Sequence, residues 1–302
     1  MHARKFSKMT KKTSIHTQSL KIPTIIIVTS KLISLISPKL VTLFAAKLFT
    51  TPIKHKIPKR ELGMDLKSVQ KLINIPAINK QINLYTYGSN GKKILLVHGW
   101  SGRGTQLYKI ADDLLNVGYS TVSFDAPGHG KSPGKTSIMT DFISIILEIN
   151  KQEGPFEVAI GHSLGGMSVL NAIKQGLKVD RAVIIGSGDI VEDIIDDFVA
   201  KLQLNHKIST LIRLHFEKKY GEKMNSYSAH LAAGETDIPV LVIHDQNDPE
   251  VPVKAGINIH NHLKNGDLLL TEGLGHRKIL GNEAVIKKIL QFIKQQTPFK
   301  GL

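Results

Sequence analysis

The sequence predicts an α/β fold with a mostly parallel sheet that helices cover on both faces. From about residue 82, short apolar runs alternate with segments whose apolar residues recur at helical spacing. Parallel strands need crossover connections of this length, and such connections place helices on the faces of the sheet. The run 161–166 adds a third observation, because a glycine-flanked serine stands there between an apolar run and a helical pattern. The length of 302 residues suits one large domain with an insertion.

Two spacings identify the individual elements. Alternating apolar and polar residues over 82–87 are typical of an edge strand, whereas uninterrupted apolar runs indicate buried strands. Apolar residues three or four positions apart indicate helices, and the helix over 105–117 ends at Gly118. Further strands are predicted over 93–97, 120–124, 158–160, 181–185, 238–244 and 267–271, and further helices over 138–149, 167–173 and 283–295.

Residues 188–237 break this alternation and lack strand patterns. They contain two helical patterns, and Asp189 and Glu192 have the spacing of a capping box ahead of the first. We expect a small helical lid, inserted before the penultimate strand, that covers the substrate pocket and excludes water. The alternative is an added layer that only stabilises the fold.

The net charge of +15 is concentrated in the first 60 residues, which hold thirteen Lys/Arg and no Asp or Glu. The other 242 residues hold 27 basic and 25 acidic residues. A nucleic-acid-binding domain spreads its basic excess over a folded face, so no nucleic-acid partner is expected. The chain has no cysteine, which excludes disulfides and thiol nucleophiles and fits a reducing compartment. We therefore expect a cytoplasmic protein.

Residues 1–60 are predicted to form a basic, apolar leader outside a catalytic domain over 61–302. The leader has no uncharged run of the roughly 18 residues that span a bilayer. We favour a tail followed by a helix that packs on the catalytic domain, because Pro38 and the interspersed lysines leave no clean amphipathic face. The alternative is peripheral membrane contact through residues 20–60, where lysines attract anionic headgroups.

The run 161–166, Gly-His-Ser-Leu-Gly-Gly, has the pattern of a nucleophile elbow. Such a turn holds its middle residue, Ser163, in a strained backbone conformation and lifts the side chain clear of the sheet. Gly161 and Gly165 are needed because a side chain at either position would collide with the neighbouring strand or helix. We predict Ser163 as a nucleophile, which then requires a base, a group that orients the base, and donors for the oxyanion.

The acid and the base are expected after later strands, in the chain order serine, acid, histidine. Asp245 and Asp248 both follow the strand over 238–244. We favour Asp248, which lies further into the loop and can turn back toward a histidine, whereas Asp245 can cap the turn at the strand end. His276 follows the last strand and a glycine-rich approach, so we predict it as the general base.

Two backbone amides are candidates for the oxyanion hole. Leu164 follows the nucleophile at the N-terminus of its helix. Trp100 lies in the loop after the strand over 93–97, where a glycine permits the turn. The candidate residues of the substrate pocket are His98, Gly99, Trp100 and His162.

As a set, these motifs resemble the α/β-hydrolase superfamily, and within it the esterase, monoacylglycerol-lipase and serine-aminopeptidase-like group. The resemblance implies the α/β-hydrolase fold, a triad of Ser163, Asp248 and His276, and oxyanion donors at Trp100 and Leu164. Many relatives have glycine where Asp245 stands. The residues that carry the resemblance lie at 96–100, 125–132, 161–166, 248–252 and 275–276.

The expected function is hydrolysis of a small-molecule ester or acyl substrate through an acyl-enzyme on Ser163. This chemistry needs no metal and no organic cofactor. Two alternatives stay open at this point. One is an acyltransferase that uses the same triad, and the other is a non-catalytic binding module that keeps the hydrolase fold.

Overall fold

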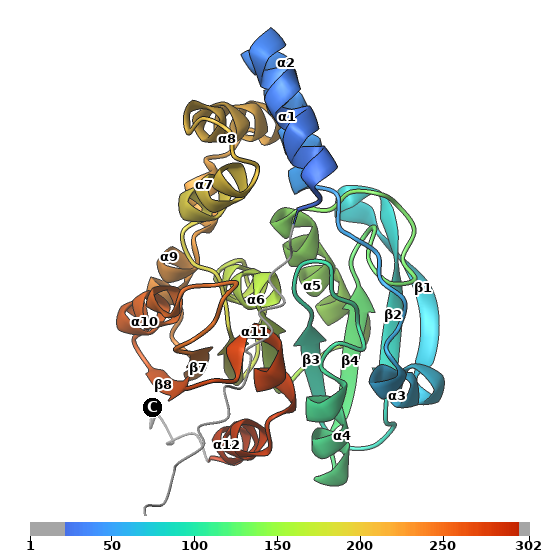
Figure 1. The fold of residues 1–302 in the computed structure, drawn as a ribbon. Helices are drawn as coiled ribbons and strands as arrows, with labels where there is room; N and C mark the ends of the chain where they lie inside the picture. Colours follow the sequence, from blue (N-terminus) through green and yellow to red (C-terminus); the bar gives the residue numbers. More distant parts are fainter. Residues whose placement is uncertain (1–21, 296–302) are drawn as a thin grey trace, which may run out of the picture.

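A central sheet of eight strands organises the chain, of which a computed structural model describes residues 22–295. The strand order is β1-β2-β4-β3-β5-β6-β7-β8 (Figure 1). Strand β2 runs antiparallel to both of its neighbours, and every other neighbouring pair is parallel. This arrangement confirms the predicted mostly parallel sheet. The strands are β1 Val69–Ile75, β2 Lys80–Tyr87, β3 Lys93–Val97, β4 Ser120–Asp125, β5 Val158–His162, β6 Arg181–Ile185, β7 Val240–Asp245 and β8 Gly266–Thr271.

Helices cover both faces of the sheet, as the alternation of the sequence predicts. Successive side chains of a strand point to opposite faces, so Ile94 and Leu96 of β3 enter one core while Leu95 and Val97 enter the other. The first core is completed by α3 (Leu62–Lys67), α4 (Tyr108–Asn116) and α12 (Glu283–Lys294), and the second by α5 (Met139–Glu153), α6 (Leu164–Lys174), α9 (Ala229–Gly234) and α10 (Val253–His262).

The segment between β6 and β7 is helical, as predicted, and includes α7 (Val191–Lys201) and α8 (Lys207–Tyr220) besides α9. The predicted capping box is wrong, because no side chain caps α7, whose N-cap is Ile190. The Asp189 carboxylate instead accepts hydrogen bonds from the backbone and ring of His230 and from the Asn258 amide. It therefore ties the start of this insertion to α9 and α10.

Two further helices, α1 (Thr24–Ile36) and α2 (Pro38–Phe49), pack against each other, and α2 packs on α8. We call residues 24–49 the N-terminal hairpin; its turn at Ser37 projects away from the sheet (Figure 1). At the other end, the centroid of the Phe49 ring lies 5.2 Å from that of Phe198 in α7 and 6.0 Å from that of Phe216 in α8. Within residues 22–295, no helix is long and apolar enough to cross a membrane.

The structure differs from the prediction at one edge of the sheet. Strand β2, expected at the edge, lies second in the sheet, and β1 takes the edge position. Only Ile73 and Ile75 of β1 are buried, so this strand lacks the apolar run that marks the others. The boundary at residue 60 between a leader and a catalytic domain stays a prediction, and residues 1–21 lie outside the described part of the chain.

Candidate active site

Ser163 stands at a sharp turn between β5 and α6, with φ 55° and ψ −121°. A side chain at Gly161 would place its Cβ 2.4 Å from the Gly165 carbonyl oxygen, and one at Gly165 would lie 2.3 Å from the Val97 carbonyl oxygen. Both separations are far below van der Waals contact, so the turn can form only with glycine at these two positions. The strained serine and the need for both glycines agree with the elbow that the sequence predicts.

Backbone hydrogen bonds fix the elbow from both sides. The Ser163 amide donates to the Ile185 carbonyl oxygen of β6 at 2.9 Å, and its carbonyl oxygen accepts from the Gly166 amide at 2.9 Å. The Ser163 hydroxyl makes no hydrogen bond to another described residue, and the side chain lines a large cavity. The hydroxyl is therefore held at the cavity wall with its hydrogen-bonding capacity unused.

Asp248, in the loop after β7, contacts the imidazole of His276 directly. His276 Nδ1 lies 2.7 Å from Asp248 Oδ2, and both side chains are buried. The other carboxylate oxygen accepts from the amides of Glu250 and Val251, at 2.8 and 2.9 Å. Burial raises the pKa of the Asp248 carboxyl, but the hydrogen bond and charge of His276 together with these amides bring the pKa below its usual value. Asp248 is thus an ionised carboxylate aimed at one ring nitrogen.

The second carboxylate, Asp245, lies at the end of β7 and is fully buried. Its Oδ2 accepts from the Thr271 hydroxyl at 2.7 Å and from the Leu274 amide at 2.9 Å, and its Oδ1 accepts from the Asn247 amide at 3.0 Å. Burial raises the pKa of Asp245, but these donors lower it overall. Asp245 therefore caps the turn at its own strand end and also holds the loop that leads from β8 to His276.

His162, the residue before the nucleophile, holds the backbone of His276 in place. His162 Nε2 donates to the His276 carbonyl oxygen at 2.9 Å, and the two ring centroids are 4.6 Å apart. Burial and the neighbouring His276 hold the pKa of His162 well below its usual value, so the His162 ring is neutral near pH 7. His162 thus fixes the backbone that carries His276 without adding a charge.

The amides of Trp100 and Leu164 are both available as donors. Neither donates a hydrogen bond to any residue within the described chain. Leu164 is the first residue of α6, where the helix leaves its amides without internal partners. The loop that carries Trp100 is fastened through His98, whose Nε2 accepts from the Ala126 amide and whose Nδ1 donates to the Gly99 carbonyl oxygen.

A cavity of about 1510 Å³ lies over these residues, and Ser163, His276, Asp248 and Trp100 all line it. Three of the four predicted pocket residues do not line it, which corrects the prediction for His98, Gly99 and His162. The two histidine rings are buried and engaged with backbone groups, and Gly99 has no side chain to present. The apolar part of the lining includes Ile26, Phe49, Met167, Ile194, Phe198 and Phe216.

The contribution of the N-terminal hairpin to this cavity is absent from the sequence-based prediction of the site. Ile26 of α1 and Phe49 of α2 belong to a segment that we predicted to lie outside the catalytic domain. Apolar periodicity in the leader signals that these side chains pack against something, but nothing in the sequence shows which surface they meet. Among residues 22–295, no group of three or more His, Cys, Asp or Glu side chains is placed to hold a metal ion.

Comparisons with known proteins agree with this architecture. Residues 94–236 match the model of the alpha/beta hydrolase family, and residues 221–298 match a model described as TAP-like protein. An esterase from Exiguobacterium antarcticum superposes with a TM-score of 0.60 at 17% identity, covering 75% of this chain and all of that one. A monoacylglycerol lipase from Paleococcus ferrophilus superposes with a TM-score of 0.55 at 19% identity, covering 70% of this chain and 98% of that one. These structural likenesses concern the fold.

Similar sequences carry hydrolase names. Lysophosphatidylserine lipase ABHD12 of Danio rerio is 27% identical over 191 residues, which is 58% of this chain and 48% of that protein. The chain therefore spans about half the length of this relative. The (E)-2-((N-methylformamido)methylene)succinate hydrolase of Acinetobacter baylyi is 23% identical over 256 residues, which is 73% of this chain and 97% of that protein.

Proposed function

We propose that this chain, which belongs to the α/β-hydrolase superfamily, hydrolyses carboxylic esters through an acyl-enzyme formed on Ser163. The chain is an enzyme of the α/β-hydrolase type, and the names of its relatives, which include a lipase and esterases, support small-molecule esters as its substrates. The observation that carries the proposal is the 2.7 Å contact between Asp248 and His276 at a cavity that Ser163 also lines.

In the acylation step, His276 Nε2 takes the Ser163 proton while the serine oxygen attacks the ester carbonyl carbon. Asp248 accepts the Nδ1 hydrogen bond, which selects the tautomer with a free Nε2 and stabilises the imidazolium that forms. The bond from the carbonyl carbon to the alcohol oxygen then breaks, and His276 returns the proton to the departing alcohol. Water repeats the sequence: it gives a proton to His276, attacks the acyl carbon and releases the acid and Ser163.

The amides of Trp100 and Leu164 stabilise the oxyanion of each tetrahedral intermediate. Neither amide donates a hydrogen bond within the described chain, so both can bind the substrate oxygen without breaking an existing bond. The removal of one such donor in a known hydrolase costs roughly 10²–10³ in turnover, which sets the scale of the contribution of each amide.

The apolar part of the cavity accommodates the acyl group. Its volume of about 1510 Å³ exceeds the roughly 300–1,000 Å³ of ordinary ligand pockets, so it has room for a long acyl chain. Phe198 of α7 and Phe216 of α8 belong to this lining. The insertion therefore acts as a lid that contacts the acyl chain and excludes water from it.

The direct test is labelling of the full chain with a fluorophosphonate probe, which reacts only with an activated serine. Wild type should be labelled, Ser163→Ala should not, and Ser226→Ala, a substitution of an exposed serine of the insertion, should be labelled like wild type. With a soluble short-chain ester, Ser163→Ala should lower kcat by a factor on the order of 10⁶.

Each alternative has its own outcome in the same experiment. An unlabelled wild-type protein that binds esters without turning them over would indicate a binding module and refute the proposal. Labelling of Ser163 combined with exclusive transfer of the acyl group to an added alcohol, and none to water, would identify an acyltransferase.

A further inference from the structure

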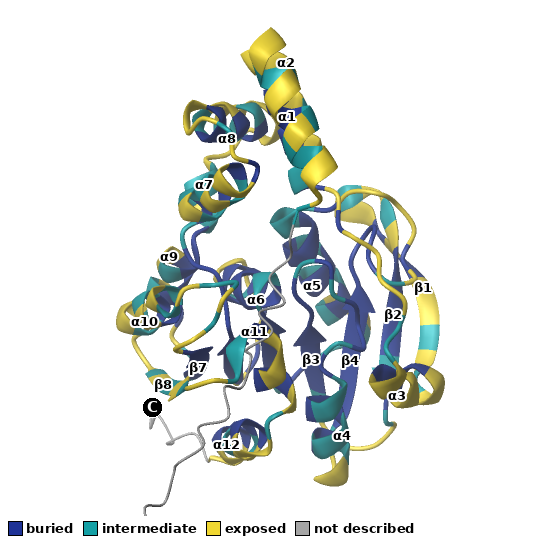
Figure 2. Cartoon of the chain, viewed as in Figure 1, coloured by how far each residue is buried: buried dark blue, intermediate teal, exposed yellow. Residues whose placement is uncertain are grey.

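The N-terminal hairpin carries a continuous apolar stripe on its uncovered side. Within each helix the stripe residues recur at intervals of three or four positions, which places them along one side of that helix. Leu35 and Ile36, next to the turn at Ser37, are 84% and 77% exposed. Figure 2 shows exposed positions, in yellow, along α1 and α2. The members of the stripe are Ile25, Val28, Leu32, Leu35, Ile36, Leu40 and Leu43, all of them exposed.

The opposite side of the hairpin is firmly packed, so the exposed stripe does not result from a detached segment. Val41 and Ala45 of α2 are fully buried in the core. Phe49 packs on the insertion, and Ile26 and Phe49 line the cavity that contains Ser163. The hairpin therefore has one face that shapes the substrate cavity and another that nothing within residues 22–295 covers.

The charges of this region have a single sign. Between residue 22 and residue 60 there is no Asp or Glu, and the charged residues are Lys31, Lys39, Lys47, Lys54, Lys56, Lys59 and Arg60. Each basic residue near a negatively charged lipid surface adds electrostatic attraction to it. A surface that is both apolar and basic is complementary to a bilayer that contains anionic lipids.

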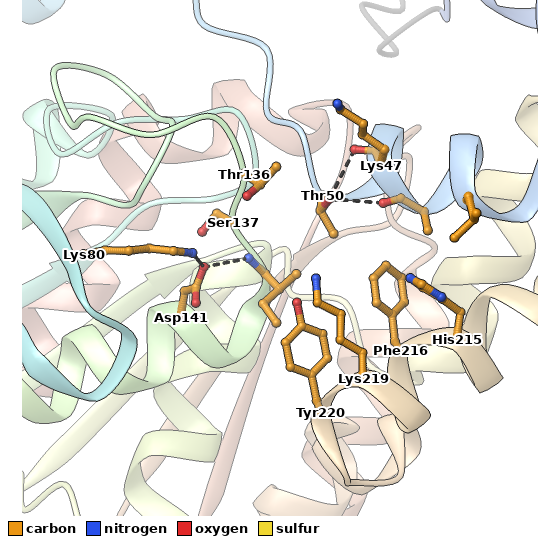
Figure 3. Close-up of a pocket in the computed structure, with 13 residues that line it drawn as sticks. Lys47, Thr50, Lys80, Thr136, Ser137, Asp141, His215, Phe216, Lys219 and Tyr220 are labelled. Atoms are coloured by element: carbon orange, nitrogen blue, oxygen red, sulfur yellow. Dashed lines mark hydrogen bonds and ion pairs between the residues drawn. The ribbon is translucent and has the colours of Figure 1, made fainter.

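The stripe ends at a basic hollow of about 230 Å³ between α2, α8 and the loop over 136–138 (Figure 3). Leu43 of the stripe and Lys47 line it from α2, and Lys219 lines it from α8. The one carboxylate among the described residues of the lining, Asp141, pairs with Lys80 at 2.7 Å, so the two other lysines leave the hollow with a positive balance. Neither lysine forms an ion pair with a described carboxylate. The buried Ser137 hydroxyl, which also lines the hollow, has no hydrogen-bond partner. Cations beside an unused hydroxyl are suited to a phosphate oxygen of a lipid headgroup.

The positive charge of the hairpin also favours a lipid surface over a second copy of this chain as the partner that covers the stripe. Two hairpins packed stripe to stripe would bring lysines against lysines with no carboxylate between them, and like charges that face each other oppose association. A lipid surface avoids this repulsion. Since α1 and α2, with 13 and 12 residues, are too short to span a bilayer, they would lie at its surface.

We propose that the N-terminal hairpin docks on an anionic lipid bilayer, with its apolar stripe between the headgroups and the basic hollow on a headgroup phosphate. Docking in this way brings the helices that line the cavity into contact with the lipid. The docking itself does not depend on the chemistry of Ser163.

The test is sedimentation of the full chain with vesicles of phosphatidylcholine, alone or mixed with phosphatidylglycerol. Wild type should bind the mixed vesicles more tightly than the neutral ones. Leu35→Ser/Ile36→Ser should weaken that binding roughly tenfold or more, because two apolar side chains no longer enter the interface. Lys39→Glu should weaken it by about fivefold or more on mixed vesicles and have little effect on neutral ones.

The matched control is Leu66→Ser/Leu72→Ser, which removes two exposed leucines from α3 and β1 and should bind like wild type. Ser163→Ala should also bind like wild type, so a failure of the proposed ester hydrolysis would leave this test intact. Circular dichroism and hydrolysis of a soluble short-chain ester check that the hairpin variants are folded.

Three results would overturn the docking of the hairpin, and a fourth would overturn the role of the hollow in it. Wild type could fail to sediment with the mixed vesicles. The Leu35→Ser/Ile36→Ser variant could bind as tightly as wild type, which would assign any binding to another part of the chain. Wild type could form a dimer that this double variant abolishes, without vesicle binding, which would assign the stripe to a second copy. Inorganic phosphate should displace wild type from mixed vesicles more effectively than sodium chloride at the same ionic strength. Equal displacement by the two salts would show that the hollow has no specific role.

Discussion

The rim of the sheet and the helical cap beside it are held together by different forces. The rim comprises the loops that carry Trp100, Ser163, Asp248 and His276, and the cap comprises the N-terminal hairpin with α7 and α8. In the rim, buried polar side chains are fixed by hydrogen bonds such as the 2.7 Å contact of Asp248 with His276. In the cap, apolar side chains from distant parts of the sequence pack together, as Phe49 does on Phe198.

This difference predicts how each region responds to substitution. A hydrogen bond depends on direction and on the identity of both atoms, so an isosteric change in the rim can remove its function. Apolar contact is non-directional and depends on area, so a change in the cap should have a graded effect. Rim substitutions should therefore alter catalysis or the fold, whereas cap substitutions should alter the choice of substrate.

After the loss of Ser163 itself, the largest effect should come from Asp248→Asn in the rim. An asparagine amide can hold His276 in the wrong tautomer and cannot stabilise the imidazolium, so kcat should fall by a factor on the order of 10⁴. The measurement is steady-state hydrolysis of a soluble short-chain ester. A variant that is folded and keeps kcat within tenfold of wild type would show that Asp248 does not orient the base.

The neighbouring substitution Asp245→Asn should act mainly on stability. It leaves buried donors, such as the Leu274 amide, without a full set of acceptors, so the free energy of unfolding should fall by about 2–3 kcal/mol. Urea unfolding measures this, and kcat per folded molecule should fall far less than in Asp248→Asn. If Asp245→Asn proved the more severe variant in kcat, the roles of the two carboxylates would have to be exchanged.

Acid should destabilise the fold through two buried histidines, His98 of the rim and the neighbouring His129. Burial lowers the pKa of His98 to about 4 and that of His129 to about 3. An unfolded histidine takes up a proton near pH 6.5 but the folded His98 ring does not until about pH 4, so stability should fall as the pH drops through this window. For His98 alone, the loss between pH 7 and pH 5 should be about 2 kcal/mol.

Urea unfolding at pH 7 and pH 5 tests this expectation with two variants. His98→Asn should show a smaller decline between the two pH values than wild type, even if it is less stable at both. His206→Asn, which removes an exposed histidine of the insertion, should decline like wild type. Parallel declines for wild type and His98→Asn would assign the acid sensitivity to other groups.

The smallest effect should come from Phe198→Ala in the cap. The substitution removes apolar contact with the distal part of a long acyl chain, so kcat/KM for long-chain esters should fall by about fivefold while butyrate esters are hardly affected. A series of esters of graded chain length provides the measurement. An equal loss for short and long esters would mean that Phe198 serves the fold rather than the acyl chain.

The elbow is the part of the rim that the sequence indicates most directly, because its geometry is local. The elbow needs only a strand, a helix and glycines at Gly161 and Gly165, and all of these lie within a short stretch of the chain. The preference for Asp248 over Asp245 rests on its position in one loop, and the structure places Asp248 against His276.

The cap is harder to predict because it depends on contacts between distant segments. Nothing in the sequence around Phe49 indicates that its ring meets Phe198 and Phe216. Pro38 suggests an interruption of the apolar pattern, but it occupies the first turn of α2, where proline is well tolerated, and Ser37 caps that helix. The apolar stripe therefore continues through the proline, although the sequence favours no clean amphipathic face.

The backbone at Ser163 has a consequence for the resilience of the whole molecule. A residue with a β-carbon at φ 55° and ψ −121° raises the free energy of the native state by roughly 1–3 kcal/mol. Glycine lacks the β-carbon, so most of this strain is absent when glycine occupies the position. A Ser163→Gly enzyme should then withstand more denaturant than the natural chain while turning nothing over. At this position, conformational stability and catalytic activity are opposed. Selection for stability alone, without an assay of turnover, would replace the nucleophile.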